Sequence, residues 1–220
     1  MSIVIAIDGT AASGKGTLAR KIASALDYAY LDTGKLYRYI GYSILQNGQD
    51  PADEAVAIDM AMRLKDTLSP ADLADPALGS DEAGQAASKC AQFQPVRDIL
   101  ISFQREFAEN PPQGKVGAIL DGRDIGTVIY PDAPVKLYID AKTAIRAERR
   151  TKELQSKGIS VTYDAVLADM LERDKRDASR SAAPMKPADD AKILDTSDMT
   201  IEEVLNQSMD YIRNILDQRA

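Results

Sequence analysis

The chain has 220 residues, of which 45% are hydrophobic and 28% charged, a composition typical of one folded domain with a sizeable core. It contains one cysteine, Cys90, and no histidine, which excludes an internal disulfide, a multi-cysteine metal site, Ser-His-Asp catalysis and most zinc chemistry. The net charge of -7 argues against a protein that coats nucleic acid, and the sequence has neither a signal-peptide pattern nor an apolar run of membrane-spanning length. We therefore expect a cytoplasmic protein that binds neither nucleic acid nor a membrane.

Short apolar runs alternate along the chain with segments of helical period. Strands are expected at residues 3–8, 28–32, 116–122, 135–141 and 192–197, and helices at residues 15–26, 34–45, 143–155, 163–178 and 201–216. Parallel strands need crossover connections, which helices usually supply, so this order predicts an α/β fold with a five-stranded parallel sheet between two layers of helices. The strands are apolar almost throughout, as is typical of strands buried on both faces.

Residues 51–111 differ, because they have helical spacing with no strand among them. Helical patterns cover residues 53–68 and 81–109, whereas residues 69–80 are rich in proline, glycine and serine and are typical of a loop. We interpret residues 46–112, approximately, as a helical insertion within a single domain that comprises residues 1–220.

A glycine-rich segment joins the first predicted strand to the first predicted helix. Its pattern Gly9-x-x-x-x-Gly14-Lys15 is typical of a phosphate-binding loop, in which backbone N–H groups, a helix N-terminus and one lysine surround an anion. A glycine-rich turn that only tightens packing is the alternative, but it would not need the lysine. The candidate nucleotide-binding residues are Gly9, Thr10, Ala11, Ala12, Ser13, Gly14, Lys15, Gly16 and Thr17.

The residue after Lys15 narrows the class of protein. In the general loop this position holds a serine or threonine that binds Mg²⁺, whereas here it is Gly16. Mg²⁺ would then be held mostly by water and phosphate oxygens, so no protein ligand to the metal is assigned, and Thr17 is expected to contact a phosphate. The chain also lacks the Asn-Lys-x-Asp segment that reads guanine in GTP-dependent switches.

Arginines accompanied by acids make up the remaining unusual pattern. Residues 142–186 hold eleven basic and seven acidic side chains, a net charge of +4 that suggests a compact anionic ligand. Within them, Arg173, Asp177 and Arg180 have the spacing of one helix face, for which a solvated ladder of ion pairs is the alternative interpretation. Phosphoryl transfer depends on positioning and charge compensation, which lysine and arginine supply without histidine.

The motifs together resemble those of the bacterial cytidylate kinases, which belong to the nucleoside monophosphate kinase family. The resemblance extends over nearly the whole chain, through "IDGTAASGKGT", "LDTGKLYR", "AASKCAQFQPVR", "LDGRDIGTVIYPDAPVKLYIDA", "ERRTKELQSKG", "ERDKRDASRSAAP" and "LDTS". It implies a P-loop fold and the reaction of ATP with CMP or dCMP, in the presence of Mg²⁺, to give ADP and CDP or dCDP. It also implies small-molecule partners only, and we expect a monomer.

The resemblance further implies the roles of particular residues. It places the acceptor's phosphate on Arg38, Arg123 and Arg180, its ribose on Arg173 and Asp177, and its cytosine between Ser88, Arg97 and Asp124, with Thr33 at the same junction as Arg38. Cytosine presents an amino group that a carboxylate such as Asp124 can accept, whereas uracil presents a carbonyl there. Such a mismatch costs about 1–3 kcal/mol, enough for a tenfold or greater preference.

Residues 148–162 resemble the family's short lid. The lid is expected to close over ATP, exclude water and bring Arg149 toward the transferring phosphate, so that Lys15, Arg149 and Arg180 are the candidate catalytic residues. A solvated basic face is the alternative for Arg149 and its neighbour Arg150. The insertion before "AAS" is shorter than in many family members, which leaves open a looser choice between CMP and UMP.

Two other functions use the same phosphate loop. A kinase for another small acceptor, such as UMP, AMP or shikimate, would not need Ser88, Arg97 and Asp124 together. A module that senses ATP without transferring its phosphate has no use for a second arginine cluster. A scaffold with a degenerate loop conflicts with an intact Lys15.

Overall fold

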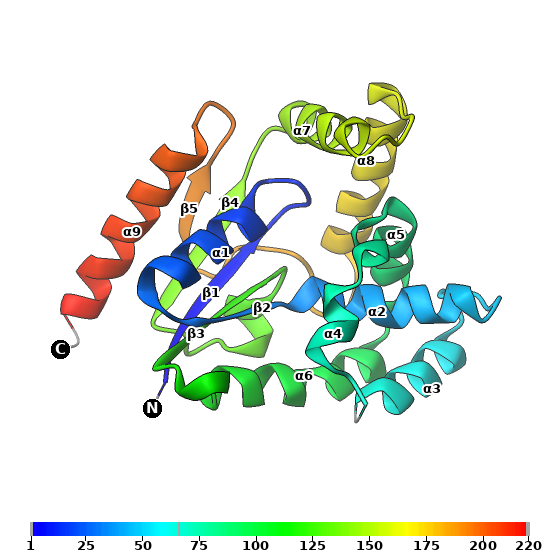
Figure 1. Cartoon of the computed structure of the whole chain (residues 1–220), viewed down its shortest axis with the longest axis horizontal. Coiled ribbons are helices and arrows are strands. Elements are labelled where there is room, and N and C mark those ends of the chain that lie inside the picture. The colour runs from blue at the N-terminus through cyan, green and yellow to red at the C-terminus, as the bar shows by residue number, and fades with distance from the viewer. Residues whose placement is uncertain (1, 66, 219–220) are drawn as a thin grey trace.

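The computed structural model describes residues 2–65 and 67–218 and has the predicted three-layer α/β architecture (Figure 1). Five strands pair in parallel in the order β2-β3-β1-β4-β5. Their bounds are β1 Ile3–Gly9, β2 Ala29–Asp32, β3 Gly117–Gly122, β4 Val135–Asp140 and β5 Lys192–Asp195. Each lies where an apolar run was expected, so the predicted sheet is confirmed.

β3 and β4 are joined through a π-helical turn, whereas helices lie between the other successive strands and after β5. The helices are α1 Lys15–Leu26, α2 Thr33–Gln46, α3 Glu54–Lys65, α4 Pro70–Ala74, α5 Asp81–Cys90, α6 Gln94–Glu109, α7 Thr143–Ser156, α8 Tyr163–Ser179 and α9 Ile201–Asp217. Three short turns add to them: 3₁₀ turns at Pro76–Gly79 and Pro112–Gly114, and a π-helical turn at Ile125–Ile129. Within the described residues, no helix is long and apolar enough to cross a lipid bilayer.

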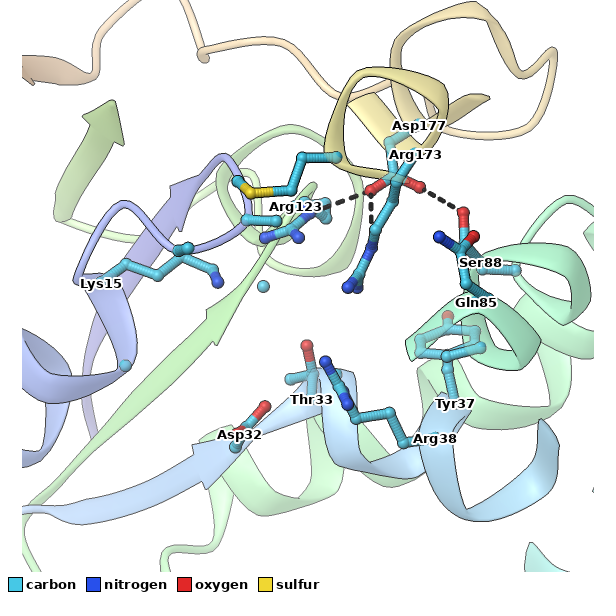
Figure 2. Close-up of a pocket in the computed structure, with 18 of the residues that line it drawn as sticks. Lys15, Asp32, Thr33, Tyr37, Arg38, Gln85, Ser88, Arg123, Arg173 and Asp177 are labelled. Carbon is cyan, nitrogen blue, oxygen red and sulfur yellow. Dashed lines mark hydrogen bonds and ion pairs between the residues drawn. The ribbon is translucent and has the colours of Figure 1, made fainter. Parts of the chain in front are cut away.

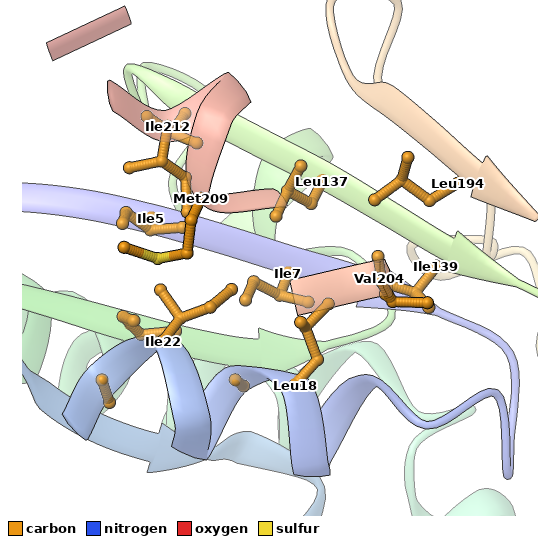
Figure 3. Close-up of a cluster of buried hydrophobic side chains, with 14 residues drawn as sticks. Ile5, Ile7, Leu18, Ile22, Leu137, Ile139, Leu194, Val204, Met209 and Ile212 are labelled. Atoms are coloured by element: carbon orange, nitrogen blue, oxygen red, sulfur yellow. The ribbon is translucent and has the colours of Figure 1, made fainter. Parts of the chain in front are cut away.

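Side chains that alternate along the central strand β1 build the two halves of the core. Ile5 and Ile7 point toward α1 and α9, where they pack with Ile22 and Ile212 (Figure 3). Val4 and Ala6 point to the other face and pack beneath α6 and the π-helical turn. Because this alternation buries both faces of β1, the strand is fixed in the middle of the sheet.

The edge strand β5 departs from the expectation that the strands are buried on both faces. Of its residues only Leu194 is buried, whereas Ile193 is 57% exposed. It pairs with β4 alone among the described strands, so one of its sides is open. The apolar run "KIL" therefore indicates a strand correctly but overstates how deeply it is buried.

The insertion forms a separate helical cluster beside the sheet. Buried side chains of α2, α3, α5 and α6 pack together, with Cys90 at their centre. Residues 69–80, expected to be a loop, contain α4 and a 3₁₀ turn, because Ser69 and Asp72 form a capping box that starts α4. The helical pattern at residues 81–109 is interrupted at residues 91–93, and α5 and α6 are distinct helices.

A matched pair of isoleucines tests where the core lies. Ile22 is fully buried between α1 and the sheet, so Ile22→Ala should lower the free energy of unfolding by about 2–5 kcal/mol through lost burial and the cavity left behind. Ile193→Ala removes the same atoms from an exposed site and should cost less than about 1 kcal/mol. Urea unfolding of both variants measures the difference, and equal losses would contradict this account of the core.

Candidate active site

The phosphate loop lies at the carboxyl end of β1, between β3 and β4, where open α/β sheets bind their ligands. Glycine is required at Gly9, because a Cβ there would lie 1.9 Å from the carbonyl oxygen of Ile139 on the neighbouring strand β4. Gly14, at the N-cap of α1, has φ +92°, a conformation that favours glycine. Gly9 is therefore needed because β4 approaches its backbone closely, and Gly14 is needed because its backbone has a positive φ.

Side chains within the loop and beside it bind its carbonyl groups. Ser13 donates its hydroxyl to the carbonyl of Thr10, Arg146 donates to the carbonyl of Ala11 at 3.1 Å, and Thr196 donates to the carbonyl of Ser13 at 3.1 Å. The N–H groups in the first turn of α1 have no partner within the helix, as at any helix start. The loop therefore keeps donors available for an anion while its acceptors are occupied.

Lys15, the first residue of α1, lies beside the end of β3. Its Nζ is 3.7 Å from Oδ1 of Asp121. The other carboxylate oxygen of Asp121, Oδ2, accepts a 2.8 Å hydrogen bond from the Tyr30 hydroxyl. Burial, with a contribution from the charge of Arg123, lowers the pKa of Lys15 to about 8, and burial raises the pKa of Asp121. Asp32 is the residue of β2 that pairs with Asp121, so two carboxylates lie at adjoining strand ends near the lysine.

One cavity of about 230 Å³ opens from the phosphate loop toward the insertion (Figure 2). Ala11, Ala12, Lys15 and Gly16 line its loop end. All of the predicted substrate-binding residues line it too: Thr33, Arg38, Ser88, Arg97, Arg123, Asp124, Arg173, Asp177 and Arg180. Residues from β2 to α8, far apart in the sequence, thus meet in one space.

Arg38, Arg123 and Arg173 lie close together in the cavity, and of these three only Arg123 donates a hydrogen bond to a carboxylate of the described residues. Arg123 donates to Asp177 at 3.2 Å, whereas Nε of Arg173 is 4.0 Å from Asp177 and is buried without a hydrogen-bond partner. Burial and the charges of Arg123 and Arg38 lower the pKa of Arg173 to about 9. Burial is the main cause of this lowered pKa and the neighbouring arginines add to it, so an anionic ligand that contacts Arg173 would offset part of the cost of its charge.

A glycine allows two of these arginines to meet. A Cβ at Gly84 on α5 would lie 3.0 Å from an Arg173 nitrogen and 3.1 Å from an Arg38 nitrogen. Arg38 also donates to the carbonyls of Leu78 at 2.6 Å and Ser80 at 2.9 Å, so the 3₁₀ turn before α5 orients its guanidinium. The insertion therefore shapes the cavity as well as covering it.

Asp177 links the arginine cluster to α5. Its Oδ1 accepts a 2.9 Å hydrogen bond from the Ser88 hydroxyl, and both residues are buried (Figure 2). Burial alone would raise the pKa of Asp177, but Arg123, Arg173 and Arg180 hold it below its ordinary value. Ser88 thus lies in the cavity as predicted, and its partner is Asp177 rather than Arg97 or Asp124.

A buried ion pair forms the far end of the cavity. Arg97 on α6 donates to Asp124, and both side chains are almost fully buried. The guanidinium also lies 5.4 Å from the centre of the Tyr37 ring, within cation–π range, and donates to the carbonyl of Ala91. Asp124 therefore has a charged partner yet retains lone pairs for a ligand.

The structure corrects the placement of Arg180. It was expected on one helical face with Arg173 and Asp177, but α8 ends at Ser179 and Arg180 has extended backbone angles. Its Nε donates to the carbonyl of Ala183, and its NH2 lies 3.8 Å from Asp124. Arg180 thus reaches the cavity from the C-cap of α8, beside Asp124.

The two arginines of the expected lid have different surroundings. Arg149 donates to the hydroxyl of Thr196 at 3.1 Å and to its carbonyl at 2.6 Å, and it does not line the cavity. Arg150 does line it, and donates to Asp81 of α5 and to the carbonyl of Gly79. The sequence thus pointed to this pair of arginines and gave Arg149 the catalytic role. In the structure it is Arg150, which had been given no definite role, that lines the cavity.

Sequence reasoning also missed several residues of the site. Asp32 and Asp121 are the last or next-to-last residues of strands beside the phosphate loop, a position that could have marked them. Tyr37 and Gln85 gave no such signal, because aromatic and polar residues on a helix have many ordinary roles.

Comparison with known proteins agrees with this geometry. The family model described as cytidylate kinase matches residues 5–214. The chain belongs to the cytidylate kinase family. It is 54% identical to the cytidylate kinase of Paramagnetospirillum magneticum over 212 residues, which cover 96% of this chain and 98% of that protein. It is 51% identical to the cytidylate kinase of Rhodospirillum rubrum, over 96% of this chain and 97% of the other.

A solved structure shows the same fold at much lower identity. A sugar kinase from Janibacter sp. HTCC2649 superposes with a TM-score of 0.51 and 13% identity, covering 96% of this chain and 95% of that one. At this identity the likeness concerns the fold alone.

The Arg97–Asp124 pair provides a stability test of the site. Arg97→Met should lower the free energy of unfolding by about 3 kcal/mol, because it leaves the Asp124 carboxylate buried without its closest partner. Arg63→Met removes an arginine of the exposed Arg63–Asp59 pair and should cost less than about 0.5 kcal/mol. Chemical denaturation of the two variants measures both values, and a small loss for Arg97→Met would show that this pair is not sealed from water.

Proposed function

We propose that this protein transfers the γ-phosphoryl group of ATP to the phosphate of CMP or dCMP, producing ADP and CDP or dCDP. The observation that carries the proposal is that the phosphate-loop lysine and the acceptor-side arginines line one cavity. A site for one nucleotide would not need cations at both ends. Direct transfer between two bound nucleotides does need them.

ATP would bind with its triphosphate on residues 9–17. The N–H groups at the start of α1 and the Lys15 ammonium would contact the phosphate oxygens, as the glycine pattern implies. CMP would lie at the other end of the cavity, with its phosphate on Arg38, Arg123 and Arg180 and its ribose near Arg173 and Asp177. Both nucleotides would then meet near Lys15 and Arg123.

The residues around Lys15 also fit a magnesium ion. Gly16 replaces the usual hydroxyl residue, and a Cβ there would be 3.2 Å from Oδ2 of Asp121, so this carboxylate lies next to the position that the hydroxyl would take. Asp32 and Asp121 supply the oxygen ligands that Mg²⁺ prefers, either directly or through water. When bound, Mg²⁺ would neutralise charge on the β- and γ-phosphate oxygens.

The chemistry needs no protein base. At neutral pH a phosphate monoester is largely dianionic, so an oxygen of the CMP phosphate can attack the γ-phosphorus directly. A new P–O bond forms there as the bond to the β-γ bridging oxygen breaks, and that oxygen leaves on ADP. Lys15 and the arginines hold the two polyanions in line and compensate the charge on the transferring group.

Lid closure would complete the site. Arg150, in the middle of α7, joins this helix to the insertion through Asp81, and both residues line the cavity. We infer that residues 148–162 move with α7 when ATP binds and exclude water from the reacting phosphates. Every residue in these steps belongs to one chain, so a monomer would suffice.

The direct test is a panel of nucleoside monophosphates assayed for ADP production with ATP and Mg²⁺. CMP and dCMP should give acceptor-dependent ADP, whereas AMP and GMP should not. ADP that forms equally without any acceptor would indicate an ATPase or a sensor. Preference for a monophosphate other than CMP or dCMP would overturn the assignment of the acceptor.

Asp124 is proposed to select cytosine over uracil. Asp124→Asn replaces an oxygen that accepts from the cytosine amine with a group that can donate to the uracil carbonyl. The ratio of kcat/KM for CMP to that for UMP should therefore fall about tenfold or more. Asp59→Asn, at an exposed carboxylate on α3, is the control, and an unchanged ratio in Asp124→Asn would show that Asp124 does not read the base.

The lowered pKa of Lys15 predicts how ATP binding depends on pH. Since Lys15 loses its proton near pH 8 in the free protein, the dissociation constant for ATP should rise about fivefold between pH 8 and pH 9. In the same window the unfolded chain keeps its lysine protonated, so Lys15 itself makes stability rise with pH rather than fall. Calorimetric titration of wild type and Lys15→Arg measures this, and a flat wild-type profile would contradict it.

A further inference from the structure

Asp8 is a buried carboxylate at the end of β1 that the proposed reaction does not use. It is 4% exposed, directly precedes the phosphate loop and does not line the cavity. Strand alternation places it on the same face as Val4 and Ala6, beneath the π-helical turn Ile125–Ile129. There its Oδ1 accepts a 2.8 Å hydrogen bond from the N–H of Ile125, and its Oδ2 accepts another of 2.8 Å from the N–H of Gly126.

These two bonds fix the segment that carries Arg123 and Asp124. The π-helical turn begins directly after Asp124, whose carbonyl accepts from the N–H groups of Val128 and Ile129. The first N–H groups of such a turn have no acceptor within the turn. Asp8, on β1, provides one carboxylate oxygen to each of two of them. A carboxylate held by two bonds fixes the orientation of the turn as well as its distance.

The residue after Asp8 holds the same segment. The carbonyl of Gly9 accepts a 2.7 Å hydrogen bond from NH1 of Arg123. Asp8 and Gly9, consecutive at the start of the phosphate loop, thus bind a side chain and two backbone groups in residues 123–126. The turn that carries Arg123 and Asp124 is therefore attached directly to the two residues at the start of the phosphate loop.

We propose that Asp8 is a positioning residue that sets Arg123 and Asp124 in register with the phosphate loop, so that the acceptor is presented in line with the γ-phosphate. The inference rests on the proposed function, since it takes Arg123 and Asp124 to hold the acceptor. It adds a residue that touches neither nucleotide but determines how well one of them binds.

The charge at this position is unfavourable on its own, which a purely structural role would not require. Burial, together with the carboxylates of Asp124 and Asp121, raises the pKa of Asp8 to about 7 despite its two backbone hydrogen bonds. A neutral side chain could fill the same space without this electrostatic cost, but it would not offer two acceptors to two N–H groups. The geometry therefore indicates that the turn needs to be attached to β1 through both carboxylate oxygens of Asp8.

Asp8→Asn tests the proposal, because it keeps the size of the side chain but turns one acceptor into a donor that faces an N–H group. The dissociation constant for CMP should rise at least tenfold, and that for ATP should stay within about twofold of wild type. KM values for the two nucleotides should show the same split. Asp140→Asn is the matched control, because Asp140 accepts from the Thr10 hydroxyl of the phosphate loop at 2.7 Å, and the larger effect should then fall on ATP.

A second variant covers the case in which Asp8→Asn does not fold. Gly126→Ala leaves the Asp8 charge intact but places a Cβ 3.1 Å from the Lys136 side chain and 3.5 Å from Oδ2 of Asp8, so the turn or the Lys136 side chain must give way by a few tenths of an ångström. It should weaken CMP binding several-fold and leave ATP binding unchanged. A lowered melting temperature with both affinities unchanged would show that Asp8 is structural only, and equal weakening of both would overturn its assignment to the acceptor side.

The wild-type protein separates this inference from the proposed function. If wild type binds CMP but produces no ADP with it, the proposed function fails, while the calorimetric comparison still decides the role of Asp8. If wild type phosphorylates CMP and the variants show no split, the proposed function stands and the positioning role is wrong.

Discussion

Several positively charged side chains lie together in one buried cavity, and the arrangement of the site depends on how the fold positions them there. Lys15, Arg38, Arg123 and Arg173 line a single cavity, and Asp177 is the carboxylate closest to the arginines among them. Burial is the largest cause of the lowered pKa values of Lys15 and Arg173, and the charges of neighbouring arginines add to it. This burial of charge costs free energy in the free protein, and an anionic ligand that contacts these groups would offset part of that cost.

The sheet makes this crowding possible. Its central strand β1 ends in a loop that needs glycine at two positions, and the neighbouring strands β3 and β2 end in carboxylates that face the lysine. The helical insertion then supplies Ser88 and Arg97, and α8 supplies Arg173 and Asp177, from the opposite side. Rigid elements therefore position the charged groups, and the parts expected to move, at α7 and residues 157–162, lie at the mouth of the cavity.

The sequence predicted the strands, most helices and many of the residues that line the cavity, because strand period, glycine spacing and the family motifs are local patterns. It did not predict α4, whose start depends on a reciprocal contact between Ser69 and Asp72. It did not distinguish which of Arg149 and Arg150 lines the cavity, because neighbouring residues on a helix point about 100° apart and packing decides which one faces inward. Asp8 escaped notice for a related reason, since its partners lie more than a hundred residues away.

Cys90 has a practical consequence for following the motion of the enzyme. It lies at the centre of the helical insertion, its thiol contacts the carbonyl of Pro51, and burial raises its pKa to about 12, so it resists alkylation in the folded state. Because the chain has no other cysteine, a pair of cysteines introduced on α7 and α5 could carry fluorescent dyes without removal of the native thiol. Energy transfer between the dyes would then test, one molecule at a time, whether α7 moves relative to α5.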